Sequence, residues 1–197
     1  NTSWMSPPPN RPYAAKTYDA LGRVREDIQP SFYKTSYYYL GGKTAIIDVK
    51  QHQTVQEADG LGRTIKVSQY MGSYSTPNWN AAPYAAASYQ YSAANDLEKV
   101  TSGINASTVI TMSYDLYGNK TSMRDPDMGL WQYAYNTNRL VSQTDARGQT
   151  VCLYYDGHGR LIGKYYQKNN TFCYPYGLPP DAPAQYGYDQ TNDGNKG

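Results

Sequence analysis

"YDGHGRLIGKYY", residues 155–166, contains one complete turn and the strand that follows it. An aspartate at the start of a turn can accept backbone N–H groups, and a glycine supplies the positive φ that closes a hairpin. We therefore expect Asp156 and Gly159 to build a hairpin turn. Arg160 follows the turn and can reach back to Asp156, where an exposed ion pair contributes at most about 1 kcal/mol. Its expected role is to fix the turn geometry.

The same pattern recurs along the chain. Similar segments begin at Tyr18, Tyr38, Ala58 and Tyr114, and two looser copies carry Asn95 and Asn138 at the glycine position, where asparagine is the next best residue for a positive φ. The copies are roughly 20 residues apart, with two longer steps that each carry an insertion of about a dozen residues. The turn residues predicted from this alignment are Asp19, Gly22, Arg23, Gly42, Gly62, Arg63, Asp115, Gly118, Asn138, Asp156, Gly159 and Arg160.

Between the turns, apolar and polar residues alternate with period two. Trp131, Tyr133 and Tyr135 alternate with Gln132 and Ala134, which predicts a strand with one aromatic face. A unit of about 20 residues fits two strands and two turns, and such a hairpin cannot bury its aromatic face until neighbouring units extend the sheet. We expect an aromatic ladder made of Tyr18, Tyr38, Tyr91, Tyr114, Trp131, Tyr133, Tyr135 and Tyr155.

The composition supports β structure. The 197 residues have a mean hydropathy of −0.77 and include 23 tyrosines, which pack well on a pleated face. With 18 Lys and Arg against 16 Asp and Glu, and no run of like charges, neither nucleic acid nor an acidic membrane is indicated as a partner. No apolar stretch approaches the roughly 20 residues of a membrane span. Because the first residues show neither an initiator Met nor a signal peptide, we expect a fragment or a processed product.

Several segments resemble the YD repeats of the RHS repeat family, which includes bacterial RHS proteins, the B and C subunits of insecticidal toxin complexes and the animal teneurins. They are "YDALGRV" from Tyr18, "DGLGRT" from Asp59, "YDLYGNKTSMRDPDMGLWQYAYNTNRL" from Tyr114 and "TDARGQTVCLYYDGHGRLIGKYY" from Thr144. The resemblance covers roughly residues 13–197. It implies a long, strongly curved β-sheet that spirals into a hollow shell, commonly around the chain's own C-terminal toxin or effector.

Two features depart from this family picture. The chain is too short to close a large shell, and it lacks the "DPxGLxxGxNxY"-like signature that usually ends an RHS core. The nearest match, "RDPDMGLWQY" at residues 124–133, falls in the middle of the array and is interpreted as an ordinary second turn of a unit.

The predicted fold class is all-β, with tandem β-hairpin YD repeats of about 20 residues forming a curved, spiralling antiparallel sheet. Residues 1–12 are expected to form an extended Pro-rich lead-in, and residues 13–197 a single array with insertions at about 71–90 and 167–187. The first insertion is either an ordered loop packed on the sheet or a flexible arm. The prolines of the second exclude a central strand.

The last unit opens at Tyr188 and the sequence stops inside its turn, so the array is expected to be truncated at its C-terminus. The expected partners are therefore the remainder of the same chain or further copies, which would cover the open sheet edges.

The sequence contains two cysteines, Cys152 and Cys173. Proteins of the family that it resembles are usually exported and can therefore keep disulfides. Each lies three residues before a tyrosine, so both have the same side-chain parity. In a regular array they would lie about 9.6 Å apart, beyond the roughly 7 Å limit for a bridge. The proline-rich insertion can instead fold back and bring Cys173 above Cys152. We predict a disulfide, with two free thiols as the alternative.

No residue pattern indicates catalysis. His158 fills a turn position that varies among the repeats, and His52 lies in a polar stretch, so neither has the nucleophile and orienting partner that a catalytic base needs. Asp125 and Asp127 could bind calcium, but a plain turn is the favoured interpretation. We expect no catalytic residue, no metal and no cofactor.

The predicted function is a structural segment of a larger extracellular or cell-surface RHS/YD-repeat shell or filament, for which the resemblance implies an enclosed toxin or effector. The alternative is a cell-surface carbohydrate-binding adhesion module that uses exposed Tyr and Trp rows. An enzyme is a distant third hypothesis. Glycans are a further candidate partner, although the sequons at Asn1, Asn105, Asn119 and Asn169 carry little weight in a chain of this composition.

Overall fold

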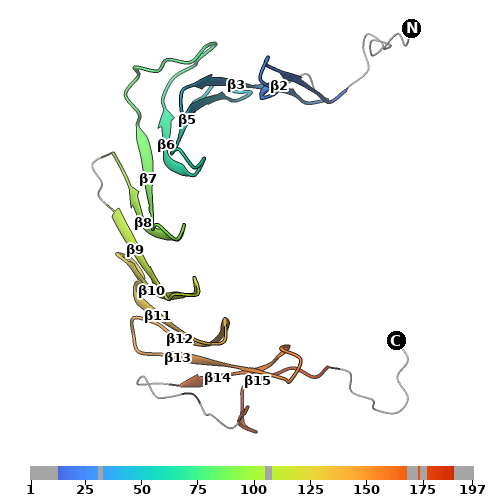
Figure 1. Cartoon of the computed structure of the whole chain (residues 1–197), viewed down its shortest axis with the longest axis vertical. Coiled ribbons are helices and arrows are strands. Elements are labelled where there is room, and N and C mark those ends of the chain that lie inside the picture. The colour runs from blue at the N-terminus through green and yellow to red at the C-terminus, as the bar shows by residue number, and fades with distance from the viewer. Residues whose placement is uncertain (1–12, 31–32, 105–107, 168–172, 174–176, 189–197) are drawn as a thin grey trace. The chain divides into compact units, whose positions relative to one another are not determined.

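The computed structural model describes residues 13–30, 33–104, 108–167, 173 and 177–188. The expected lead-in at residues 1–12 and the last turn, after Tyr188, lie outside these residues. In the described part of the chain all fifteen regular elements are strands, most of which are labelled in Figure 1. They are β1 (Ala15–Tyr18), β2 (Val24–Ile28), β3 (Lys34–Leu40), β4 (Lys43–Ile47), β5 (Gln53–Ala58), β6 (Thr64–Tyr70), β7 (Ala85–Tyr91), β8 (Leu97–Ser102), β9 (Thr108–Tyr114), β10 (Lys120–Asp125), β11 (Gly129–Asn136), β12 (Arg139–Thr144), β13 (Thr150–Tyr155), β14 (Leu161–Gln167) and β15 (Ala184–Gln185).

The strands follow one another in the sheet in chain order, each antiparallel to the next wherever the register is defined. The predicted all-β class of tandem antiparallel hairpins is confirmed, whereas the curvature of the array stays a prediction. The chain divides into two compact units, Asn1–Gln90 with Val100–Thr108, and Tyr91–Lys99 with Val109–Gly197.

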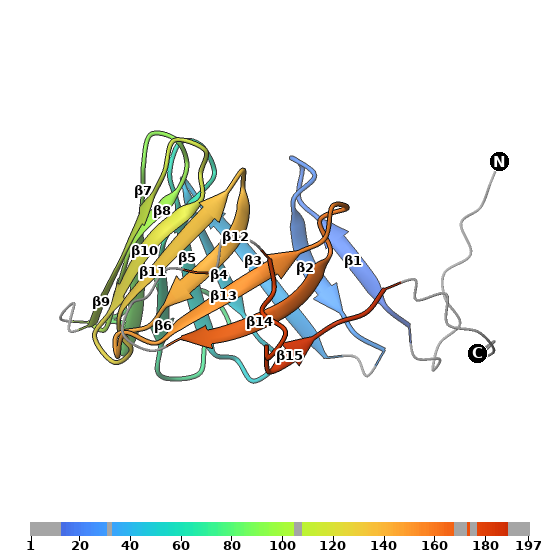
Figure 2. The same ribbon diagram turned by 90° about the horizontal axis from the view of Figure 1, so that it is seen from below.

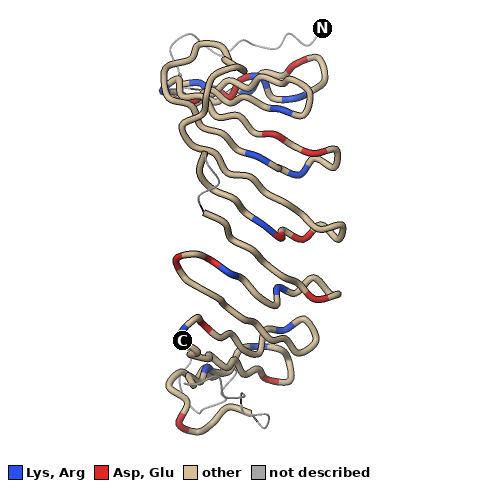
Figure 3. Tube along the Cα trace, turned by 90° about the vertical axis from the view of Figure 1, so that its left-hand side faces the viewer, with Lys and Arg blue, Asp and Glu red and all other residues tan. Residues whose placement is uncertain are grey.

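Five-residue turns join many of the hairpins, and the Asp156 turn shows their common geometry. The Asp156 amide donates to the Arg160 carbonyl at 2.9 Å, and the Gly159 amide donates to the Asp156 carbonyl at 3.0 Å. Oδ1 of Asp156 accepts the amides of His158 and Arg160, both at 2.9 Å. The same bonds occur in the turns that begin at Asp19, Asp59 and Asp115, and Ser92 provides its hydroxyl oxygen in the same role. Figure 3 shows acidic residues at several hairpin ends.

The fourth residue of each five-residue turn has a positive φ. Gly159 has φ 85°, and Asn95, which takes this place in the Ser92 turn, has φ 75°. The sequence prediction for this asparagine is therefore correct, because a left-handed residue is needed to close the turn.

Two hairpins have two-residue turns instead, Gly41–Gly42 and Thr137–Asn138. Asn138 has the expected positive φ, at 60°. Gly42 lies in the turn as predicted, but the positive φ of 59° belongs to Gly41. Gly42 is required for a different reason: a Cβ at this position would lie 2.9 Å from the carbonyl oxygen of Ala58.

Two further five-residue turns were not among the predicted turns. Asp48–His52 joins β4 to β5, and Asp145–Gln149 joins β12 to β13, with the same backbone and Oδ1 hydrogen bonds as the other turns. Ile47 and Thr144 precede them. Gln51 and Gly148 supply the positive φ, at 66° and 73°.

In the first unit, the predicted excursion is an ordered loop that covers one face of the sheet. Ala45, Val55 and Tyr70 are buried there, and Tyr74, Trp79 and Ala81 of the loop pack against them. The expected boundary at residue 90 is wrong, because β7 begins at Ala85 and pairs with β6. The Ala- and Ser-rich composition suggested a loop, but backbone pairing determines the strand.

In the second unit, Thr150, Cys152 and Tyr154 are buried on one face of β13. The structure joins Cys152 and Cys173 by a disulfide with a Cα–Cα distance of 5.5 Å. The expected insertion at 167–187 is too long at both ends, because Gln167 belongs to β14 and Ala184–Gln185 form β15. Figure 2 shows β15 beside β14, where Gly163 pairs with Gln185.

The turn geometry leads to a first prediction. Gly159→Val should lower the free energy of unfolding by about 1–3 kcal/mol, because a β-branched residue would be forced to a positive φ. Its Cβ would also lie 2.8 Å from Nη2 of Arg139. His158→Ala, at the exposed neighbouring position, is the matched control and should change the stability by less than about 0.5 kcal/mol. Urea unfolding of both variants measures the difference, and equal stabilities would contradict the turn assignment.

Candidate functional site

The candidate site is the contact between successive repeats, which is built on the predicted turn residues. Nε of Arg160 donates to Oδ2 of Asp156 at 2.7 Å, and Arg23 and Arg63 contact Asp19 and Asp59 in the same way. The backbone amide of Arg160, and then its guanidinium, lower the pKa of Asp156 to about 2. In each of these three turns the carboxylate therefore holds an arginine in place.

Two of these arginines, Arg23 and Arg160, also lie over the ring of a tyrosine that follows later in the chain. Cζ of Arg23 lies 4.0 Å from the centre of the Tyr39 ring, and Cζ of Arg160 lies 4.7 Å from the ring of Tyr188. Arg139, which follows a two-residue turn, lies 5.0 Å from the ring of Tyr155. A cation over an aromatic face contributes about 0.5–1 kcal/mol at an exposed site.

Tyrosine hydroxyls contact the hairpin that precedes them in the chain. Tyr155 donates to the carbonyl of Leu140 at 2.9 Å and Tyr39 donates to the carbonyl of Val24 at 2.7 Å. Tyr114 makes the corresponding bond to Leu97, at 2.9 Å. The accepting residues lie at the start of a strand of the preceding hairpin. A register shift follows Val24 and Leu140, so the hydroxyl binds where a β-bulge interrupts the ladder.

We call this arrangement the repeat contact: a turn carboxylate holds a cation, the cation lies over a later tyrosine, and the tyrosine hydroxyl binds the preceding hairpin. All three parts occur together at Asp19, Arg23 and Tyr39, and the other sites show one or two of them. The arginine's second partner and the hydroxyl bond were not predicted. The signal in the sequence is a tyrosine 15 to 17 residues after the accepting carbonyl.

The predicted ladder residues differ in their contacts and burial. Tyr114 and Tyr155 belong to the repeat contact, Trp131, Tyr133 and Tyr135 share one half-buried face of β11, and Tyr91 is half-buried. Tyr18 is 58% exposed. The expectation for Tyr38 is wrong by one residue: Tyr39 makes the contact, and Tyr38 packs on the opposite face with the buried cluster. The shorter Gly41–Gly42 turn shifts the alignment by one position.

The polar residues that were considered as catalytic or metal-binding groups belong to turns. Nδ1 of His52 lies 3.3 Å from Oδ2 of Asp48, and His158 is exposed at a turn tip. Oδ1 of Asp125 accepts the amides of Asp127 and Met128. Within the described ranges no group of three or more His, Cys, Asp or Glu side chains could hold a metal ion. Nor do those ranges contain a helix that is long and apolar enough to cross a membrane.

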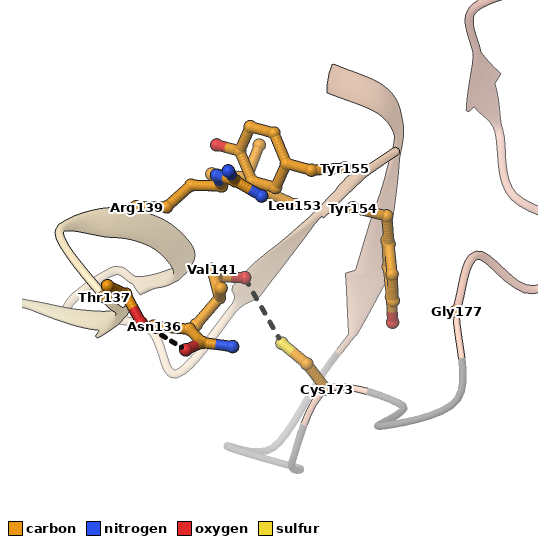
Figure 4. Close-up of a pocket in the computed structure, with 9 residues that line it drawn as sticks. All are labelled: Asn136, Thr137, Arg139, Val141, Leu153, Tyr154, Tyr155, Cys173 and Gly177. Carbon is orange, nitrogen blue, oxygen red and sulfur yellow. Dashed lines mark hydrogen bonds between the residues drawn. The ribbon is translucent and has the colours of Figure 1, made fainter. Parts of the chain in front are cut away.

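A cavity of about 730 Å³ lies beside the disulfide in the second unit and is shown in Figure 4. Arg139 and Tyr155 of the repeat contact line it, together with Val141 and Cys173. The dashed line from Cys173 marks a distance of 3.9 Å from Sγ to the carbonyl oxygen of Val141. Because a disulfide sulfur carries no proton, this is a packing contact. The lining therefore serves the repeat contact and the disulfide.

No family model matches the sequence, and no curated protein matches it either. Solved structures do match. The crystal structure of TcdB2-TccC3-Cdc42 aligns with a TM-score of 0.64 at 17% identity, over 81% of this chain and 9% of that chain. The chain has the fold of an RHS/YD-repeat array. The crystal structure of TcdB2-TccC3 agrees, with a TM-score of 0.62 at 18% identity over 84% of this chain and 9% of that one.

A mutated Tc holotoxin pore of Photorhabdus luminescens also has the fold, with a TM-score of 0.62 at 18% identity over 81% of this chain. This chain spans only 9% of the length of each of these toxin chains. The resemblance found in the YD segments is thus confirmed at the level of the fold.

The repeat contact gives a second prediction. Tyr155→Phe should lower the free energy of unfolding by about 0.5–1.5 kcal/mol, because the Leu140 carbonyl loses its hydroxyl donor while the ring is kept. Tyr117→Phe is the matched control. Tyr117 is 81% exposed at a turn tip, and removing its hydroxyl group should leave the free energy of unfolding unchanged. Urea unfolding measures both, and an unchanged stability in Tyr155→Phe would show that the hydroxyl bond contributes nothing.

Proposed function

We propose that this chain is a structural, non-catalytic segment of a larger RHS/YD-repeat shell. The observation that supports the proposal best is the repeat contact, in which the charged and aromatic side chains of one hairpin bind the next hairpin. In a shell of this kind, each unit stabilises its neighbours through such nearest-neighbour terms.

The size of the similar structures supports a role as one part of a long chain, since this chain matches 9% of each of them. The proposed partners are further repeats of the same polypeptide or further copies, which would pair with open strand edges. An enclosed C-terminal toxin or effector, as the family resemblance implies, is part of the proposal. Whether the units form a closed shell or an open filament is decided by imaging the native particle.

We propose an extracellular or cell-surface location. The disulfide between Cys152 and Cys173 supports it, because disulfides persist in oxidising compartments and are rare in the cytosol. The similar Tc holotoxin pore is consistent with an exported protein.

The test is to isolate the native protein from its source with an antibody raised against this chain, and then to determine its intact mass and its image by cryo-electron microscopy. We expect a polypeptide several times larger than 22.1 kDa that forms a hollow β-shell, with internal density if an effector is enclosed. A monomer of about 22 kDa without further repeats would overturn the proposal.

Carbohydrate adhesion is the alternative function and needs free aromatic faces in rows. The row Trp131, Tyr133 and Tyr135 is half-buried, and Lys120 lies 5.0 Å from the Tyr133 ring. A glycan array separates the two functions. Strong binding to one class of glycan that is lost in Tyr133→Ala, with the fold intact, would favour adhesion.

A further inference from the structure

The Asp145 turn differs from the other Asp turns in one respect. In the turns at Asp19, Asp59 and Asp156 the fifth residue is an arginine that contacts Oδ2 of the aspartate, and in the turn at Asp115 an asparagine amide does so. His52 takes this place beside Asp48. In the Asp145 turn the fifth residue is Gln149. Among the described residues, Oδ1 of Asp145 accepts two backbone amides and no side chain contacts Oδ2.

Asp145 and Gln149 line a cavity of about 200 Å³ in the second unit. Its two rings are Trp131 of β11 and Tyr166 of β14, and Tyr166 is 60% exposed. Gln143 and Val151, which pair with each other across β12 and β13, lie between the two rings in the sheet. No lysine or arginine lines this cavity in the described part of the chain. Its described lining therefore combines a carboxylate and two aromatic side chains and contains no cation.

The chain itself shows which group fits such surroundings. In the repeat contact the guanidinium of Arg23 lies between the Asp19 carboxylate and the Tyr39 ring, and Arg160 lies in the same way between Asp156 and Tyr188. A planar guanidinium pairs with a carboxylate through its N–H groups and stacks on aromatic faces. As far as the structure describes the chain, the cleft beside Asp145 has the anion and the rings of this arrangement without the cation.

We propose that the cleft formed by Trp131, Asp145 and Tyr166 binds a guanidinium group supplied from outside the Asp145 turn. The amide oxygens of Gln143 and Gln149 are further acceptors for its N–H groups. The cavity is smaller than the roughly 300–1,000 Å³ of drug-sized ligand sites, which suits a single side-chain head group. The source is an arginine of another polypeptide segment or a small free guanidinium compound.

A sugar ring is a less suitable ligand for this cleft. The indole Nε1 of Trp131 is buried and has no hydrogen-bond partner among the described residues, so it could donate to a hydroxyl group. A neutral sugar, however, would leave the charge of Asp145 uncompensated, whereas a guanidinium neutralises it directly. The sugar is therefore made an outcome of the test.

The test follows the Trp131 indole N–H signal by NMR, assigned with Trp131→Phe, while N-acetylarginine methylamide is added to the oxidised chain. We expect saturable shifts with a Kd on the order of 1–10 mM, the affinity of a single ion pair with stacking. Methylguanidinium should bind similarly if the head group alone is recognised. A short Arg-containing peptide that binds at least fivefold tighter would point to a polypeptide source. Methyl β-glucoside should produce no shift.

Two variants decide the outcome, each checked for its fold by circular dichroism. Asp145→Asn should weaken binding of the capped arginine at least fivefold. Gln149→Arg recreates the Asp–Arg pair of the other turns, so it should fill the cleft from within and weaken binding more than tenfold. Gln132→Arg adds the same charge at an exposed position of β11 and should leave binding within twofold.

The proposal is overturned if the capped arginine causes no shift, or if Asp145→Asn and Gln149→Arg bind it as the unmodified chain does. It is also overturned if Gln132→Arg abolishes binding, which would indicate nonspecific charge attraction. Shifts caused by the glucoside alone would reassign the cleft to a sugar. These readouts do not depend on the size of the native protein, so they test the cleft separately from the shell function.

Discussion

Gln53→Leu is expected to lower the free energy of unfolding by about 2–4 kcal/mol, a large effect for a surface-rich repeat sheet. Gln53 is 1% exposed, and its amide group makes two hydrogen bonds to the backbone of Asn78 in the loop at residues 71–84. Nε2 donates to the Asn78 carbonyl at 3.0 Å, and Oε1 accepts the Asn78 amide at 2.7 Å. Leucine has a similar volume but would leave the Asn78 amide without its acceptor and the Asn78 carbonyl with only the 3.4 Å bond from the Ala81 amide.

Gln56→Leu on the same strand is the matched control, because Gln56 is exposed and the same chemical change should cost less than about 0.5 kcal/mol there. Urea unfolding gives the stabilities, and Trp79 fluorescence, isolated by replacing Trp4 and Trp131 with Phe, reports on the loop. If Gln53→Leu is as stable as Gln56→Leu and Trp79 is unaffected, the buried amide does not hold this loop.

Loss of the disulfide should produce an effect of similar size in the second unit. Cys152 and Cys173 are 21 residues apart, and opening a loop of that length costs about 3 kcal/mol in the chain-entropy model. Cys152 is fully buried, so its surroundings on β13 should also become more accessible. We expect the Cys152→Ser/Cys173→Ser double variant and the reduced chain to show the same loss of stability, measured by urea unfolding.

Limited proteolysis provides the second readout for this prediction. Reduction should speed cleavage within residues 173–188 while the Asp156 turn stays protected. A chain whose urea midpoint does not change on reduction, or two cysteines that label with a thiol reagent in the unreduced, denatured protein, would contradict the disulfide.

The local features of the fold could be predicted because a few adjacent residues determine them. Asp156 and Gly159 are sufficient to specify a turn, and alternation around Tyr133 is sufficient to specify the exposed and half-buried faces of β11. The errors arose where the place of a residue in one repeat was inferred by aligning that repeat with another. Aligning Tyr38 with Tyr18 ignored a turn shorter by three residues, which exchanged the two faces of β3.

The rest depends on contacts between segments that are distant in sequence. Nothing near Arg23 indicates that its guanidinium lies over Tyr39, because the register of the next hairpin decides it. The same holds for Gln53: its neighbours in the sequence do not indicate burial, yet it is one of the most buried residues in the described structure. The disulfide could be predicted only because the irregular segment before Cys173 would allow the chain to fold back.

The lengths of the connections have a consequence for altering this chain. After β1, β3, β5, β7, β9, β11 and β13 the connection has five residues or two, whereas after the even-numbered strands it ranges from three residues to fourteen in the fully described cases. The first kind contains the residues of the repeat contact, so its length is constrained by the neighbouring hairpin. New segments such as epitope tags or grafted domains should therefore be inserted after even-numbered strands, where the molecule already accommodates additional chain.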